Sequence, residues 1–100
     1  MRPLKGSSSE IRAERECAWI GDAVLALYAR QWVLREKGLM DGETFVHFTS
    51  NGFLSAFGNP TSVEARIGRI FTDGGLEPAF KWIEAELLPT FLKQVRRKGH

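Results

Sequence analysis

The sequence is poor in the residues that stabilise small secreted or zinc-binding domains. Its 100 residues contain one cysteine, Cys17, and two histidines, His47 and His100. A single cysteine excludes an intramolecular disulfide framework and a CxxC metal site, and it fits a reducing compartment. The sequence also has no N-terminal apolar signal segment and no unbroken apolar run long enough to span a bilayer. We therefore expect a cytoplasmic protein with no membrane partner.

The net charge and the length of the chain exclude fewer classes of function than its low cysteine content and its lack of long apolar runs do. The 14 lysines and arginines exceed the 12 acidic residues by two, a balance that permits an RNA partner without requiring one. With 100 residues, 43% of them hydrophobic, the chain predicts one small globular domain. Because a core of that size often depends on a partner for stability, a homodimer is the natural expectation.

Apolar residues recur at helical spacing along most of the chain, and no segment alternates with the period of a β-strand. The pattern predicts an all-α fold with four helical segments, at residues 10–37, 41–57, 61–72 and 76–97. These segments are expected to form a single helical domain at residues 10–97, preceded by a flexible tail at residues 1–9.

Residues at the ends of these segments carry start and stop signals. Ser7 stands three residues before Glu10, which is the spacing of a capping box at a helix start. Gly38 is expected to cap the first helix at its C-terminus. Pro89 is expected to kink or break the last one, because proline has no N–H to donate to the helix.

Asp22 is the only charged residue between Cys17 and Ala29. Because this stretch is apolar on every side of a helix, the carboxylate has to be solvated by a cap, a cation or a metal rather than by bulk water. Glu64 is the second acidic residue that stands apart. Ile67, Gly68 and Phe71 follow it on one side of a helix, so it lies at the edge of an apolar face.

Gly21 and Gly68 stand close in sequence to these two acids and lack side chains. The helices that carry Asp22 and Glu64 can therefore approach closely at this point, and the two carboxylates could together hold one divalent cation. Magnesium prefers carboxylate and water oxygens, and it needs only one or two protein carboxylates where a phosphate supplies further ligands. The pair is thus typical of metal-assisted phosphodiester hydrolysis.

Both carboxylates also have a simpler interpretation as helix caps. Asp22 follows a glycine and would cap a helix that begins at that point. Thr61 and Glu64 have the spacing of a capping box, in which the Glu64 carboxylate accepts a hydrogen bond from the backbone N–H of Thr61. On this interpretation the protein is a small helical interaction module.

The other residues that could have a chemical function are better explained by packing in the core or by exposure of charge to solvent. His47 has no second histidine or cysteine at a ligand spacing, so a zinc site is not expected there, and Cys17 has the character of a small core residue. Three tryptophans lie on helical stripes and are expected in the core or at a dimer surface: Trp19, Trp32 and Trp82. Four basic residues near the C-terminus are expected to form a solvated helix end or to contact RNA phosphates: Lys93, Arg96, Arg97 and Lys98.

Two motifs in the chain resemble those of the ribonuclease III family, in the same order. Residues 18–28 read Ala-Trp-Ile-Gly-Asp-Ala-Val-Leu-Ala-Leu-Tyr, similar to the family's signature helix, Glu-Arg-Leu-Glu-Phe-Leu-Gly-Asp-Ala-Val-Leu. Residues 61–77 begin Thr-Ser-Val-Glu-Ala-Arg-Ile-Gly and resemble the family's Asp-x-x-Glu-Ala-Leu-Ile-Gly block. A weaker similarity at residues 49–55 lies between them, so the resemblance covers most of residues 16–88.

The resemblance implies an all-helical endonuclease domain that works as a homodimer on double-stranded RNA. Asp22 and Glu64 match two of the family's metal-binding carboxylates. They would be the catalytic residues and the ligands of Mg²⁺, with Mn²⁺ as a substitute. Thr61 stands where the family has a further aspartate, and it would support the site or cap the helix.

The chain departs from the family at three acidic positions, which here hold Arg15, Ala18 and Thr61. The changes at Ala18 and Thr61 are similar to Mini-ribonuclease III, a bacterial subfamily that matures ribosomal RNA without a double-stranded-RNA-binding domain. The chain is also shorter than the family between residues 57 and 60, where a helical insertion is missing. Hydrolysis of double-stranded or structured RNA is the function implied. A catalytically inactive dimeric scaffold that binds RNA or protein is the alternative.

Overall fold

The computed structural model of the chain describes residues 8–98, with the side chains of residues 9–96. The elements are α1 (Ser8–Lys37), α2 (Gly42–Thr49), α3 (Asn51–Leu54), the 3₁₀ turn η1 (Ser55–Phe57), α4 (Pro60–Gly74), α5 (Leu76–Glu86) and α6 (Leu88–Lys98). No strand occurs among these residues, so the expected all-α class is confirmed. None of the helices in this part of the chain combines the length and the apolar character needed to cross a bilayer.

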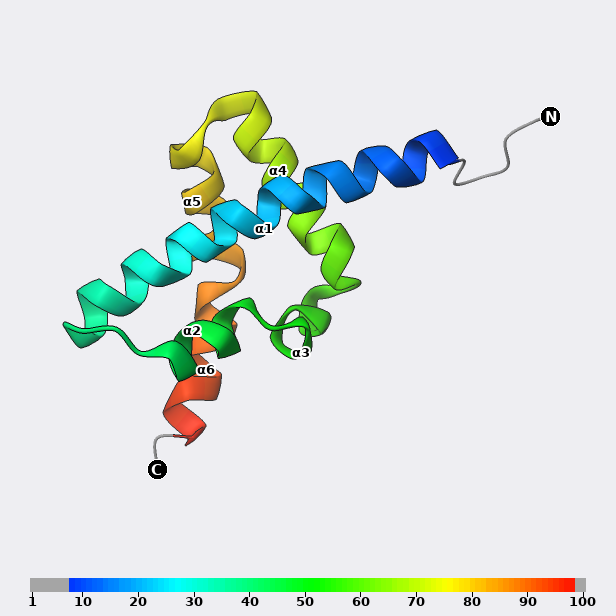
Figure 1. The fold of residues 1–100 in the computed structure, drawn as a ribbon. Helices are drawn as coiled ribbons and strands as arrows, with labels where there is room; N and C mark the ends of the chain where they lie inside the picture. The colour runs from blue at the N-terminus through cyan, green and yellow to red at the C-terminus, as the bar shows by residue number, and fades with distance from the viewer. Residues whose placement is uncertain (1–7, 99–100) are drawn as a thin grey trace.

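α1 is one continuous helix, about 45 Å long at 1.5 Å per residue. It crosses α4 (Figure 1), and its first turns extend beyond the crossing as an N-terminal arm, residues 8–16. In the described side chains of the arm only Glu14 is partly buried. The helix starts at Ser8, two residues earlier than expected, while residues 1–7, including the expected cap Ser7, lie outside the described part.

Gly38 ends α1 as the sequence predicts. Its φ of 77° lies in the left-handed region that favours glycine, and its N–H donates a hydrogen bond to the carbonyl oxygen of Leu34 at 3.0 Å. A second predicted break lies near Pro89: α5 ends at Glu86 and α6 begins at Leu88, with Leu87 between them. The break expected at that proline is therefore confirmed.

An aromatic cluster joins the second half of α1 to the shorter helices. Phe48 of α2 stacks on Phe91 of α6 with ring centroids 4.3 Å apart, and Tyr28 and Trp32 of α1 meet Phe48 edge to face. These geometries add to the stabilisation that burial provides. Trp32 is 8% exposed and so belongs to the core, whereas Trp82 of α5 is half-buried at its edge.

The sequence pattern predicted one helical segment at residues 41–57, and this prediction is wrong. The structure has three short elements there: α2, α3 and η1. The break falls at Ser50, whose ψ of 152° is extended. Its hydroxyl accepts a hydrogen bond from the N–H of Phe53 at 3.0 Å and donates one to the carbonyl of His47 at 2.9 Å. Serine competes with the helical backbone for hydrogen bonds in this way, so Ser50 ends α2 and caps α3 at once.

Candidate functional site

The candidate site lies where α1 crosses α4, and two glycines form the point of contact. A Cβ atom built on Gly21 would overlap the carbonyl oxygen of Glu64 and lie 2.9 Å from the backbone nitrogen of Gly68. A Cβ built on Gly68 would overlap the carbonyl oxygen of Cys17. The two backbones therefore touch with no side chain between them, and the close approach predicted from Gly21 and Gly68 is confirmed.

This contact brings Asp22 and Glu64 together from two helices. Glu64 is half-buried at the crossing, and its carboxyl group lies close enough to Asp22 for the two side chains to interact. The pKa of Glu64 is raised to about 7, mainly because burial disfavours the charged carboxylate and also because the negative charge of Asp22 and a hydrogen bond with its side chain act in the same direction. At neutral pH Glu64 therefore carries a proton in part of the molecules.

Asp22 itself is exposed, which corrects the sequence-based expectation that bulk water would not solvate it. The expectation treated the apolar stretch around Asp22 as buried on every side. In the structure α1 buries one face only, and apolar residues on its outer face remain in contact with solvent, among them Trp19, Ile20 and Leu27. Asp22 borders this outer face and the α4 contact, so water or a ligand can reach it.

The capping interpretation of both carboxylates is wrong. Asp22 lies in the middle of α1, where no helix begins. The N-cap of α4 is Asn59, whose Oδ1 accepts hydrogen bonds from the N–H groups of Thr61 at 2.9 Å and Ser62 at 3.3 Å. The amide of Thr61 is thus already satisfied, and the Glu64 carboxylate is free to face Asp22.

The Asn-Pro pair at residues 59 and 60 is the sequence signal that the capping-box interpretation overlooked. Asparagine is a strong N-cap residue, and proline is favoured at the first helical position because its fixed φ suits the helix. Asn59 and Pro60 together place the start of α4 ahead of Thr61. Thr61 is exposed in the first turn of α4, three residues before Glu64.

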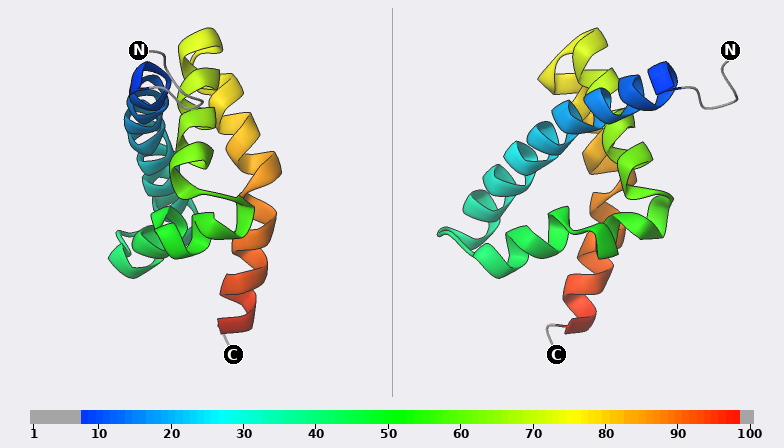
Figure 2. Two further views of the ribbon diagram at one scale, coloured as in Figure 1. Left: turned by 90° about the vertical axis from the view of Figure 1, so that its right-hand side faces the viewer. Right: turned by 45° about the vertical axis from the view of Figure 1, so that its right-hand side comes forward.

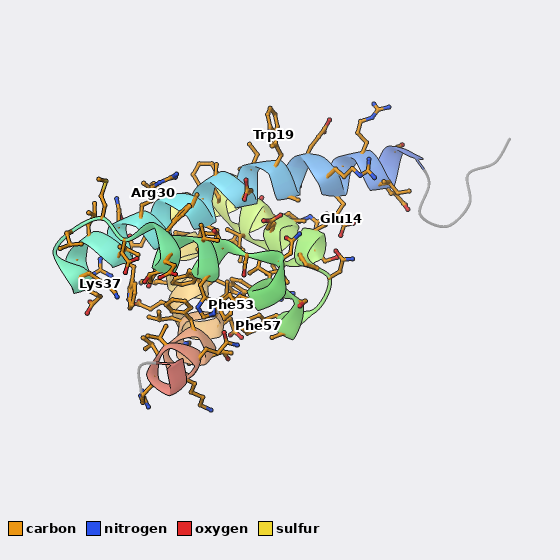
Figure 3. All side chains as sticks on the ribbon, turned by 60° about the horizontal axis from the view of Figure 1, so that its bottom comes forward. Glu14, Trp19, Arg30, Lys37, Phe53 and Phe57 are labelled. Atoms are coloured by element: carbon orange, nitrogen blue, oxygen red, sulfur yellow. The ribbon has the colours of Figure 1, made fainter. Side chains whose placement is uncertain are left out.

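A second link between the crossing helices was not expected. The hydroxyl of Ser62 donates a hydrogen bond to Oε2 of Glu14 at 3.0 Å, and it ties the N-terminal arm of α1 to the start of α4. Figure 3 shows Glu14 on the side of α1 that faces α4 and Trp19 pointing the other way. No local pattern in the sequence predicts this hydrogen bond, because Glu14 and Ser62 are 48 positions apart.

The basic residues near the C-terminus lie on α6, which extends away from the crossing of α1 and α4 (Figure 2). Lys93 and Arg96 are exposed, and the side chains of Arg97 and Lys98 lie outside the described part of the structure. The fold therefore does not bring these residues to the Asp22 and Glu64 pair.

His47 and Cys17 have structural surroundings. Nε2 of His47 and Oε1 of Gln94 form a 2.7 Å hydrogen bond between α2 and α6, and the imidazole meets the rings of Phe53 and Phe91 edge to face. Cys17 is half-buried at the α1 and α4 contact. His47 thus helps to hold α6 against α2, and Cys17 contributes its backbone to the contact with Gly68.

The donor set at the crossing fits a hard divalent cation. Two carboxyl groups converge, one exposed and one half-buried, and each supplies oxygen atoms of the kind that Mg²⁺ binds. Within the described residues no group of three or more histidine, cysteine, aspartate or glutamate side chains is placed to hold a metal. Further ligands at the crossing would have to be water or substrate oxygens.

The raised pKa of Glu64 predicts how stability depends on pH. The folded state has a pKa of about 7 at Glu64 against an ordinary value of 4.5, so it binds more protons than the unfolded chain in that window. The metal-free protein should therefore lose stability as the pH rises from about 4.5 to about 7, on the order of 1 kcal/mol after solvent screening of this half-exposed group.

Urea unfolding in EDTA at pH 5 and pH 8 measures this effect. The Glu64→Gln variant cannot ionise at this position, so its stability should fall less between the two pH values than that of the wild type. Equal pH dependence in the two proteins would show that Glu64 titrates in the folded state as it does in the unfolded chain.

A scan against protein-family models, a search of curated proteins and a search of solved structures each found no match to this chain.

Proposed function

We propose that the protein is a magnesium-dependent endoribonuclease of the ribonuclease III type, which hydrolyses phosphodiester bonds in double-stranded or structured RNA. The observation that supports this most directly is the convergence of Asp22 and Glu64 at the glycine crossing of α1 and α4. The similarity of residues 18–28 and 61–77 to the family's two motifs supports the choice of RNA as the substrate.

In this proposal Asp22 and Glu64 are the two protein ligands of one magnesium ion, and a substrate phosphate supplies further ligands. A magnesium ion held by these residues would supply Lewis-acid stabilisation of charge on the phosphoryl oxygens and activation of a water molecule. The residues of the chain fix the position of the ion. The glycine contact brings the two helix backbones directly together, and a cation bound by the two carboxylates would displace the proton that Glu64 carries in part at neutral pH.

The test is incubation of the purified protein with a long double-stranded RNA. Cleavage in Mg²⁺ that is absent in EDTA, and weaker on single-stranded RNA, supports the proposal. Binding of these RNAs without cleavage would instead support the inactive scaffold, in which the same fold holds RNA through salt-sensitive phosphate contacts.

The proposed enzyme is a homodimer, and one apolar surface is suited to the contact. Trp19 is 78% exposed, and beside it lies a shallow hollow of about 550 Å³. We name this surface the Trp19 face; its residues are Trp19, Ile20, Ala23, Val24, Leu27, Phe71 and Leu76. A projecting indole next to an apolar hollow on one surface is self-complementary under two-fold symmetry, since each copy can place its Trp19 against the other's hollow.

Trp19→Asp should convert the dimer into a monomer. A buried tryptophan at an interface commonly contributes about 2 kcal/mol or more, so the dissociation constant should rise at least about thirtyfold. Sedimentation equilibrium at micromolar concentration measures the change. Met40→Asp is the matched control, because Met40 is 83% exposed but lies in the turn after α1, away from the Trp19 face. A wild type that stays monomeric at tens of micromolar would refute the dimer.

A further inference from the structure

The N-terminal arm of α1 carries an arginine on the same side of the helix as Asp22. Seven residues of an α-helix turn through about 700°, so Arg15 lies within about 20° of Asp22 around the axis and about 10 Å from it along the axis. Arg15 is exposed, and the arm projects past α4 without a covering element (Figure 1). A ligand bound at Asp22 that continues along the arm therefore passes over Arg15.

Arg15 carries a charge that the fold leaves available. None of the ion pairs among the described residues involves Arg15 or the neighbouring Arg12. The adjacent carboxylate, Glu14, accepts its hydrogen bond from Ser62 on the side that faces α4. Glu16 lies about 120° around the helix from Asp22, so it does not stand between Arg15 and the site.

A polyanion that approaches Asp22 and Glu64 needs such a cation. Two carboxylates repel a phosphate chain, and one bound divalent ion offsets this only at the phosphate it contacts. A nucleic-acid strand carries roughly one phosphate per 3 Å of duplex axis, so several phosphates fall within the 10 Å between the site and Arg15. A guanidinium group matches the geometry of phosphate oxygens and can bind two of them at once.

We propose that Arg15 contacts a phosphate of the RNA strand that enters the Asp22 and Glu64 site, and that it positions the strand for cleavage. This rests on the proposed function, and it adds the direction in which the RNA lies: along the N-terminal arm rather than towards α6. Arg15 is a positioning residue in this proposal, since it touches the substrate away from the bond that breaks.

The experiment measures binding of a labelled duplex RNA of about 20 base pairs by fluorescence anisotropy, in EDTA and over a series of salt concentrations. Loss of one phosphate contact lowers the slope of log affinity against log salt by about one. Arg15→Ala should therefore weaken binding about tenfold at low salt and reduce the slope by about one, while Arg15→Lys should retain most of the slope. In cleavage assays Arg15→Ala should raise KM more than it lowers kcat.

Arg35→Ala is the matched control. Arg35 is an exposed arginine on the same helix, about 30 Å further along, and it pairs with Glu36 at 3.6 Å. Its replacement should leave the salt slope unchanged. An unchanged slope in Arg15→Ala, with wild-type cleavage intact, would overturn the proposal for Arg15 and leave the nuclease standing. An Arg15-dependent slope in a protein that never cleaves would support the contact and refute the nuclease.

Discussion

Replacement of Asp22 by asparagine should abolish magnesium-dependent cleavage of double-stranded RNA and leave the fold intact. Asparagine keeps the size of the side chain but removes the charge that a hard cation needs, so the rate should fall by roughly two to three orders of magnitude or more. Single-turnover cleavage with enzyme in excess over RNA measures this rate. Glu64→Gln should behave alike, because the two carboxylates face the same point at the α1 and α4 crossing.

Glu43→Gln is the matched control for these variants. Glu43 is an exposed carboxylate in the first turn of α2, and its loss should leave the cleavage rate near that of the wild type. If the Asp22→Asn variant cleaved RNA at the wild-type rate, Asp22 would have no part in the mechanism, and this conclusion would hold for any result with Glu64→Gln.

The same Asp22→Asn variant, although inactive in cleavage, should be more stable than the wild type when no metal is present. In the metal-free protein the negative charge of Asp22 acts against ionised Glu64, so the neutral amide should raise the melting temperature at pH 8. Magnesium should raise the melting temperature of the wild type, since a ligand of the folded state stabilises it, and this increase should be lost in the variant. A lower melting temperature for metal-free Asp22→Asn would indicate that the carboxylate has a structural role.

Gly68→Ala should be among the most damaging single changes in the chain. The added methyl group would overlap the carbonyl oxygen of Cys17, and neither the α1 nor the α4 backbone can yield without separating the helices. Overpacking against backbone atoms should cost about 3 kcal/mol or more, a large share of the stability of a small domain. Urea unfolding measures the cost. Gly21→Ala should be equally costly, because its methyl group would overlap the carbonyl oxygen of Glu64.

Gly52→Ala shows what the same change does where space is available. Gly52 lies inside α3, its φ is not positive, and the nearest atom to an added Cβ is the hydroxyl oxygen of Ser50 at 3.9 Å. Alanine should therefore be neutral or stabilising there by up to about 1 kcal/mol. If Gly68→Ala were no more harmful than Gly52→Ala, the tight contact between α1 and α4 would be refuted.

The helices could be predicted from the sequence because their signals are local. Helical periodicity, the positive φ of Gly38 and the missing N–H of Pro89 each act within a few residues. The split at Ser50 was missed, because a serine can lie within a helix or end one, and the choice depends on how Phe48 and Phe53 pack into the core.

The candidate site was predictable only in part. Gly21 and Gly68 marked the places where side chains are absent, but no local rule says that one glycine meets the other. The exposure of Asp22 depends on which side of α1 receives α4, and this is a property of the whole fold. The hydrogen bond between Glu14 and Ser62 depends on the angle at which the helices cross, which hydrophobic periodicity does not contain.

The crossing of α1 and α4 also bears on folding rates. Gly21 and Gly68 are 47 positions apart in a chain of 100 residues, so their contact closes a long loop, and we expect it to form after the local helices. Asp22 and Glu64 are held close together only once this contact exists. If it forms late, their repulsion is absent from the transition state, and removing it should slow unfolding while leaving the folding rate almost unchanged.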